Sequence, residues 1–447
     1  MFQIKTPLFT IALIAYVGTA FAQSPTDNSP YTRFGLGDLY NNRPVATIAQ
    51  GGTAVTWANS CGANFANPAG LGSLDLTSYE IGIYGRYSQY SSAANSSTGA
   101  TGGINNLSLS FPIFNPLNQL GLVKKRSWKW GMGFGLNPYS GIDYSIVQKD
   151  TISNFGPATR AYTGRGGLYQ LQWANGIRIK NFQAGLSLGY LFGKSQYYRA
   201  IQFTSLSYAA GDVFTDDILY NGFSVRPGLQ YELTLTQKRT DETDDDFRRR
   251  DKLHLIFGAT ANITPSMTAA NTYNYSRRQN GLSEVVEEAE NDKKTVVMPT
   301  TFTGGLRMTQ DNNWSIAAEY ETSNWSAYKN PLQNTQSFND IWALRVGGEW
   351  TPNYKSFGNY WNRVSYRAGY IMGTDPRVIL SKQITNSAVT FGMGFPVRLP
   401  RGLPSFVNVG VEVGKQGAVD LIQQNYSKLT LGFSLNDNTW FFHRKFD

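Results

Sequence analysis

The sequence is poor in the residues that build metal centres and disulfide frameworks. Its 447 residues include a single cysteine, Cys61, and two histidines, His254 and His443. One cysteine excludes an internal disulfide, and so few thiolate and imidazole ligands leave almost nothing for a zinc site. We therefore expect no cofactor and no metal, and we expect Cys61 to be a small buried side chain.

Long apolar runs and charged residues are scarce as well. After the first twenty-odd positions, no run approaches the roughly 18 apolar residues that a membrane helix needs, which excludes a bundle of such helices. Charged residues make up only 16% of the chain, whereas 14% is aromatic and 45 residues are glycine. A disordered chain would have the opposite balance. This composition favours an outer-membrane barrel, in which lipid-facing and lumen-facing residues alternate.

The first residues have the pattern of a secretory signal. Lys5 precedes an apolar stretch over residues 8–17, and Ala20-Phe21-Ala22 supplies a small-x-small cleavage site before Gln23. We predict that residues 1–22 are a signal peptide and that the mature chain starts near Gln23. The apolar stretch is too short to favour an anchor helix.

Most of the chain alternates with a period of two. Between residues 182 and 193, for example, Leu186 and Leu188 alternate with Ser187 and Gly189. A soluble sandwich would carry many more charged residues where these glycines stand, so we assign the small face to a crowded lumen. The predicted strands start near Tyr79, Asn106, Trp128, Leu168, Phe182, Phe223, Leu253, Thr301, Trp314, Ile341, Val364, Ser387, Phe406 and Ser427.

This pattern predicts an all-β fold, a 14-stranded antiparallel transmembrane β-barrel over residues 77–447, because bacterial barrels have an even number of strands. Short turns such as 180–181 and 310–313 fall on one side, which we assign to the periplasm. The longer stretches 194–217, 265–298 and 324–338 fall on the other side, as extracellular loops should.

Residues 23–76 do not alternate and precede the first strand, so we expect them to form a plug inside the barrel. They contain Asn67-Pro68-Ala69-Gly70-Leu71, which follows the run Gly51-Gly52-Thr53-Ala54-Val55. These runs resemble the N-terminal hatch of the FadL-like outer-membrane transporters of long-chain fatty acids and aromatic hydrocarbons. The stretch from Ser29 to Asp38 looks like the start of the Bacteroidota branch of that family.

The resemblance implies a monomeric barrel that is sealed by the hatch and captures hydrophobic molecules outside the cell. In that family the ligand enters from a groove among the extracellular loops and leaves sideways near a kink in the third strand. Here Asn137-Pro138-Tyr139 stands at the outer end of the third strand. Pro138 is therefore the candidate kink, although a proline where a strand ends is more often a terminator.

Two groups of residues are candidates for contact with a ligand. Leu282, Val285, Val286 and Ala289 recur at helical spacing within 281–292 and predict a short amphipathic helix, which either lines an entry groove or packs on its own rim. The lumen face carries charges of both signs, which either pair with each other and with the plug or hold a carboxylate headgroup. The predicted lumen charges are Glu80, Arg86, Lys129, Arg226, Glu232, His254, Arg307, Glu319, Glu321, Arg363, Arg367, Glu412 and Lys428.

The first functional hypothesis is passive uptake of hydrophobic compounds, fatty acids or hydrocarbons, across the bacterial outer membrane. The alternative is a non-transporting barrel subunit of an outer-membrane secretion or barrel-assembly machine, which the long periplasmic connections 115–127, 238–252 and 351–361 leave open. We expect no enzyme, because the Gly-x-Ser-x-Gly match at 185–189 lies within a strand and lacks the turn that a nucleophile elbow needs.

The expected partners follow from the location. They are outer-membrane lipid and lipopolysaccharide, a hydrophobic or detergent-like small molecule, and other outer-membrane or periplasmic proteins. The formal net charge is +9, but the basic residues are scattered and form no nucleic-acid-binding motif, so we expect no nucleic-acid partner.

Overall fold

The computed structural model describes residues 29–441 except 41–42, 93–94, 120–125, 153–155, 204–210, 238–249, 280–281, 312, 334–336, 399–402 and 419. The predicted signal peptide lies outside the described residues. Within them, no helix combines the length and the apolar character required to cross a membrane.

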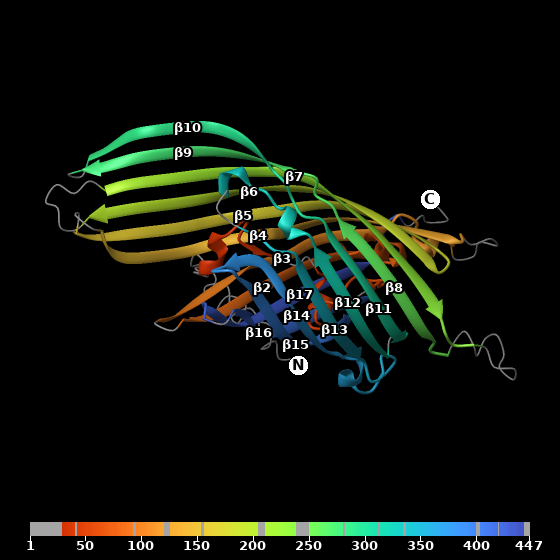
Figure 1. Cartoon of the computed structure of the whole chain (residues 1–447). Helices are drawn as coiled ribbons and strands as arrows, with labels where there is room; N and C mark the ends of the chain where they lie inside the picture. Colours follow the sequence, from red (N-terminus) through yellow and green to blue (C-terminus); the bar gives the residue numbers. More distant parts are fainter. Residues whose placement is uncertain are drawn as a thin grey trace, which may run out of the picture.

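The strands form one antiparallel sheet that closes on itself (Figure 1). The ladder between the last and first strands joins Gln423–Asp437 to Thr77–Ser91 over their whole length. The predicted 14-stranded barrel is therefore confirmed. The strands are β2 Thr77–Ser91, β3 Ser96–Pro112, β4 Trp128–Ile152, β5 Gly156–Ile179, β6 Phe182–Phe203, β7 Gly211–Thr234, β8 Leu253–Asn262, β9 Met267–Gln279, β10 Leu282–Val296, β11 Thr301–Gln310, β12 Trp314–Ser323, β13 Ile341–Trp350, β14 Ser365–Ile379, β15 Lys382–Arg398, β16 Pro404–Gly417 and β17 Gln423–Asp437.

Two of the fourteen strands are each built from two pieces. The lower part of β7 pairs with β8 and its upper part pairs with β9, so β8 and β9 continue one another. In the same way, β11 pairs with β8 and β10 pairs with β9. Pro265 and Pro299 stand in the two interruptions. A proline has no N–H to give to a ladder, so a break at these positions is the expected result.

The apolar face of the barrel is bounded by aromatic side chains. On the outer side, the ring of Tyr190 lies 5.8 Å from that of Phe192 and 5.2 Å from that of Phe223. Near the periplasmic ends, the rings of Phe114 and Trp128 are 5.0 Å apart. Aromatic girdles of this kind mark the two interfaces of an outer-membrane barrel with the bilayer.

One side of the barrel continues far beyond the outer girdle. The outer halves of β4, β5, β6 and β7, together with β9 and β10, form a curved sheet that projects past the other strands (Figure 1). We call this sheet the outer extension. The regions 194–217 and 265–298, which we predicted as loops, belong largely to it. For the same reason β5 and β7 begin well before their predicted starts at Leu168 and Phe223. Strand β3, which pairs with β2 outside the extension, also begins before its predicted start at Asn106. Beyond the lipid, nothing imposes apolar residues on every second position.

The amphipathic helix predicted over 281–292 is wrong, since the described residues 282–292 belong to strand β10. The register of β10 against β9 shifts between Val285 and Glu287 and again between Ala289 and Asp292. Each bulge inserts an extra residue and reverses the alternation. The four apolar residues do not share one face of β10, because Leu282 and Val285 are three residues apart with no bulge between them.

Residues 29–76 pack against the inward face of the barrel, and we call them the plug. The plug contains η1 Pro30–Arg33, β1 Asp38–Leu39, α2 Val45–Ile48 and η2 Pro68–Ser73. Its backbone lies directly against glycines of the wall. A Cβ at Gly131 would collide with the carbonyl oxygen of Leu71, and one at Gly185 would collide with the peptide between Pro68 and Ala69.

We expect Gly185→Ala to lower the free energy of unfolding by about 1–3 kcal/mol, because the new methyl group would push the plug backbone off the wall. Thermal unfolding of the detergent-purified barrel measures this change. Gly304→Ala is the matched control, since its Cβ would have no neighbour closer than 4.0 Å. Equal stability of the two variants would contradict the tight contact between plug and wall.

Candidate functional site

The centre of the lumen is organised by a carboxylate of the wall. Glu319 of β12 is almost completely buried, and its Oε2 accepts hydrogen bonds from the backbone N–H groups of Ala54 and Val55, each at 2.9 Å. Its other oxygen forms an ion pair with Arg43 of the plug. This one side chain therefore holds two separate parts of the plug.

The charge of Arg43 is shared by a second carboxylate. Nη2 of Arg43 lies 3.0 Å from Glu321, and Nη2 of Arg345 lies 3.2 Å from the other oxygen of Glu321. Acids and bases thus alternate from Glu319 through Arg43 and Glu321 to Arg345. Such pairing is what makes buried charges tolerable in a confined space.

A second set of contacts fixes the turn of the plug around Gln50 and Thr53. The guanidinium of Arg307 donates to the carbonyl oxygen of Thr53 at 2.9 Å and to Oε1 of Gln50 at 3.2 Å. Gln50 in turn donates to Glu349 at 2.9 Å, and Arg367 lies 2.6 Å from the same carboxylate. Charged side chains of β11, β12 and β13 therefore contact the plug directly, and Arg367 of β14 contacts Glu349.

The hatch motif is held by its asparagine. The side-chain amide of Asn67 donates to the carbonyl oxygens of Val55 at 2.7 Å and Leu229 at 3.1 Å, and its Oδ1 accepts from Ala69 N at 3.1 Å. Asn67 thus caps η2, in which Pro68 occupies the first turn, where its missing N–H does no harm. All residues from Asn67 to Leu71 are buried.

The other predicted lumen charges lie in different environments. Arg226 donates to the carbonyl oxygen of Phe65 at 2.7 Å, and Glu412 accepts from the hydroxyl of Tyr426 at 2.7 Å. Arg363 lies outside the strands, in η6 Tyr360–Arg363, where it stands over the ring of Tyr360. The further contacts are Glu80 with Asn106, Arg86 with Asp38, Lys129 with Asp75, Glu232 with Arg178 and His254, and Lys428 with the ring of Tyr84.

A cluster near the outer end of the lumen was not predicted from the sequence. Arg377 of β14 lies 2.8 Å from Asp38 of the plug and 2.6 Å from Asp375. Burial alone would raise the pKa of Asp38, but Arg377 and Arg86 outweigh it and hold that pKa below its usual range. The plug has no periodicity from which Asp38 or Arg43 could have been placed. Arg345 could have been found, because it stands directly opposite Glu319 in the β12–β13 register.

Between the plug and the outer cluster lies a cavity of about 330 Å³. An apolar ligand fits poorly here, since ligand pockets for such molecules are lined mainly by hydrophobic side chains. The charged residues on its wall are Asp38, Arg43, Arg86, Arg226, Glu321, Arg345, Asp375, Arg377, Glu412 and Lys428.

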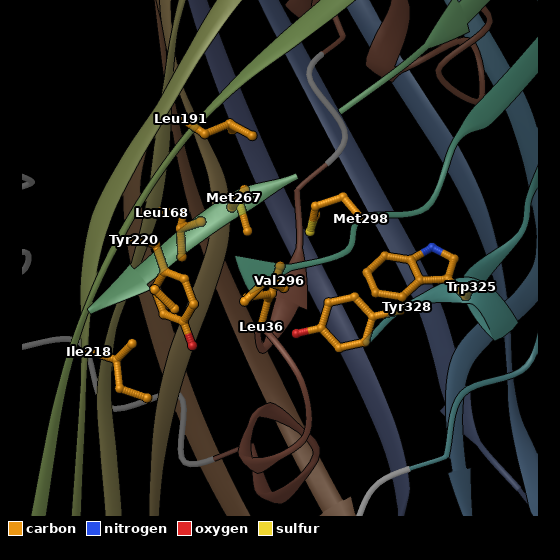
Figure 2. Packing of buried hydrophobic residues seen from close by; sticks show 11 residues of the cluster. Leu36, Leu168, Leu191, Ile218, Tyr220, Met267, Val296, Met298, Trp325 and Tyr328 are labelled. Carbon is orange, nitrogen blue, oxygen red and sulfur yellow. The ribbon is translucent and has the colours of Figure 1, made fainter. Parts of the chain in front are cut away.

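The apolar space inside the outer rim is filled by the chain itself. The connection between β12 and β13 contributes Trp325 and Tyr328, which pack beside Val296 and Leu36 (Figure 2). The pKa of the nearby Asp340 is held below its usual range, since its carboxylate accepts hydrogen bonds from Ser326. We call the cluster of buried apolar side chains around Trp325 and Tyr328 the apolar recess. Its buried members are Leu36, Leu168, Leu191, Ile218, Tyr220, Met267, Ala269, Val296, Met298, Trp325 and Tyr328.

The predicted entry residues do not reach this recess. All four, Leu282, Val285, Val286 and Ala289, are exposed on β10.

The side chain of Cys61, which we expected to be buried, is only half-buried.

Pro138 does not terminate its strand. It lies within β4, beside a bulge at Tyr139. The ladder between β3 and β4 covers only 107–112 with 131–136, so the two strands part just below Pro138. The role of Pro138 as a kink for ligand release stays a prediction.

A profile of the BamG family matches residues 3–447. Among solved structures, the toluene transporter TodX of P. putida aligns with a TM-score of 0.55 and 16% identity, covering 91% of this chain and 100% of that chain. The toluene transporter TbuX of Ralstonia pickettii aligns with a TM-score of 0.54 and 13% identity, covering 91% and 98%. No curated protein matches the chain.

These alignments establish the fold. The resemblance to the FadL-like barrels is confirmed, and the chain is a protein of the bacterial outer membrane. The Bacteroidota branch stays a prediction.

We expect Glu319→Ala to lower the free energy of unfolding by about 3–5 kcal/mol, because Arg43 would be left buried beside unsatisfied N–H groups of the plug. Denaturant unfolding in detergent measures this loss. Asp420→Ala, which breaks the exposed pair with Lys382, should change stability by no more than about 1 kcal/mol. If Glu319→Ala does not fold, Glu319→Gln should fold with an intermediate stability, and wild-type stability in either variant would refute the anchoring role.

Proposed function

The chain belongs to the BamG family, and from this membership and the closed, charged lumen we propose that it is a non-transporting barrel subunit of an outer-membrane barrel-assembly machine. The name of the family points to that machinery. The observation that carries the proposal is the ionic contact between plug and wall. A channel for apolar compounds needs an apolar route, whereas here the lumen is crossed by Glu319, Arg43, Glu321 and Arg345.

The outer extension supports the same proposal. Six strand pieces leave the bilayer as a single sheet, which gives the barrel a large surface outside the membrane. Only near the base of this sheet is its inner face covered, by the residues of the apolar recess. A monomeric channel gains nothing from such a surface, while a subunit of an assembly needs one. We propose no enzymatic role, since Ser187 is buried within β6 and His254 lies at the periplasmic end of β8.

A second candidate function is passive uptake of long-chain fatty acids or hydrocarbons. It is favoured by the fold, which the chain shares with toluene transporters, and by the parting of β3 and β4 beside the lumen cavity. Thr101 and Asn105 of β3 and Tyr139 of β4 all line that cavity. In this function the apolar recess would be the entry site, and Trp325 and Tyr328 would have to move.

We expect the affinity-tagged chain, extracted in mild detergent, to recover at least one other outer-membrane protein in a stoichiometric amount. Depletion of the chain should lower the amount of folded, heat-modifiable barrel proteins and leave the uptake of radiolabelled oleate and toluene unchanged. Recovery of the barrel alone, with a loss of uptake on depletion, would refute the proposed function and favour the second candidate.

A single substitution separates the two candidates further. Trp325→Ala should cost about 3–5 kcal/mol of stability, because it empties part of the apolar recess. Under the proposed function, oleate and toluene uptake stays at the background level in cells that carry this variant. A rise in uptake, absent in the exposed control Phe357→Ala, would favour the channel.

A further inference from the structure

The outer extension ends in two strand edges that face away from its sheet. On one side, the described part of β4 beyond Leu136 has only β1 as a neighbour in place of β3. On the other side, β10 pairs with β9, and no second ladder is formed among the described residues. An edge strand exposes N–H and C=O groups that can pair with another chain.

The β10 edge carries the features that prevent such pairing. Its two bulges interrupt the ladder, and Asn291 has a φ of 57°. Acidic side chains crowd the strand, which is exposed along almost its whole length. Proteins use bulges and charge in this way to keep an edge from pairing with another chain. The acidic residues are Glu284, Glu287, Glu288, Glu290 and Asp292.

The β4 edge has fewer of these features, although it carries the exposed Lys149. From Ser140 to Ile152 the register with β5 is continuous, without a bulge. The segment 144–152 contains no proline, and it includes the β-branched pair Ile146 and Val147, of which Val147 is 64% exposed. Its one acidic side chain, Asp150, is directed to Arg160 at 3.4 Å. Among the residues that the structure describes, one edge of the sheet is thus protected from pairing and the other is open.

The β4 edge also binds a strand already. Asp38 and Leu39 of the plug pair in antiparallel fashion with Gly141 and Ser140. Above this point η1 of the plug lies beside β4 but forms no ladder with it. Oγ1 of Thr32 donates to the carbonyl oxygen of Asp143 at 3.0 Å and accepts from its N–H at 3.2 Å. The backbone groups of Asp143 therefore point to the open side.

The orientation of the Asp143 backbone fixes the direction in which the N–H and C=O groups of the following β4 residues point. Because the backbone groups of a strand alternate between its two neighbours, Ser145, Val147, Lys149 and Thr151 share the orientation of Asp143. Their N–H and C=O groups face away from β5. The intervening residues form the ladder with β5.

We propose that the β4 edge over residues 144–152 receives an extended segment of another outer-membrane or cell-surface protein as an antiparallel strand. The inference rests on the proposed function and names the place where the partner binds. Nine residues span roughly 30 Å, enough for main-chain hydrogen bonds to supply affinity. The added strand continues the direction of β1 and carries no proline. Its alternate side chains lie beside Ile146 on the inner face and Val147 on the outer face.

Hydrogen exchange of the full-length chain tests the proposal. We expect the amides of 144–152 to exchange at least tenfold more slowly in outer-membrane vesicles than in the detergent-purified barrel, while β10 exchanges equally in both. Val147→Pro removes an N–H from the open edge without breaking the β5 ladder, and it should abolish the protection. Val286→Pro, at a bulge of the β10 edge, should leave it intact.

The outcomes separate this inference from the proposed function. Equal exchange of 144–152 in vesicles and in detergent overturns the inference, as does protection spread evenly over β5, β6 and β7. If a stoichiometric partner is recovered and 144–152 still exchanges freely in that complex, the inference falls while the subunit function stands. If the barrel purifies alone but the edge is protected in vesicles, the edge site stands and the stable-subunit function falls.

Discussion

The buried carboxylate of Glu319 is the interaction on which the closed lumen depends. Removing a carboxylate from water is expensive, and only a full set of donors makes it tolerable. Arg43 and two N–H groups of the plug supply that set. The buried carboxylate of the wall is therefore tolerable only when the plug is in place, and the plug is in turn held by that carboxylate. The glycines along the inner face follow from this arrangement, because only they let the plug backbone come close enough for these bonds.

The part of the fold within the bilayer could be predicted from the sequence because lipid imposes a strict rule on it. Every second residue must be apolar, and this rule placed strands such as β6 and β11 at their observed starts. Outside the bilayer the rule does not apply. The outer halves of β5 and β7 were therefore missed, and the exposed strand β10, which has no regular alternation, was mistaken for a helix.

The site was predicted only where it lies on regular strands. Glu319 and Arg307 were found because the alternation assigned them to the lumen, and the structure places both against the plug. Arg43 and Asp38 could not be found, since an irregular segment has no register from which to read the direction of a side chain. The motif at Asn67 identified the segment but not its contacts, which depend on strands more than a hundred residues away.

The close fit of the plug also sets an order for building the molecule. The plug is the N-terminal part of the chain, and the barrel closes only when β17 meets β2, the two ends of the sequence of strands. A backbone that touches the wall on several sides cannot be threaded into a finished ring. The wall must therefore be wound around the plug, which acts as the template for its circumference. Closure of so distant a pair of strands is a slow step, and until it occurs Glu319 depends on the segment that was made first for its hydrogen bonds.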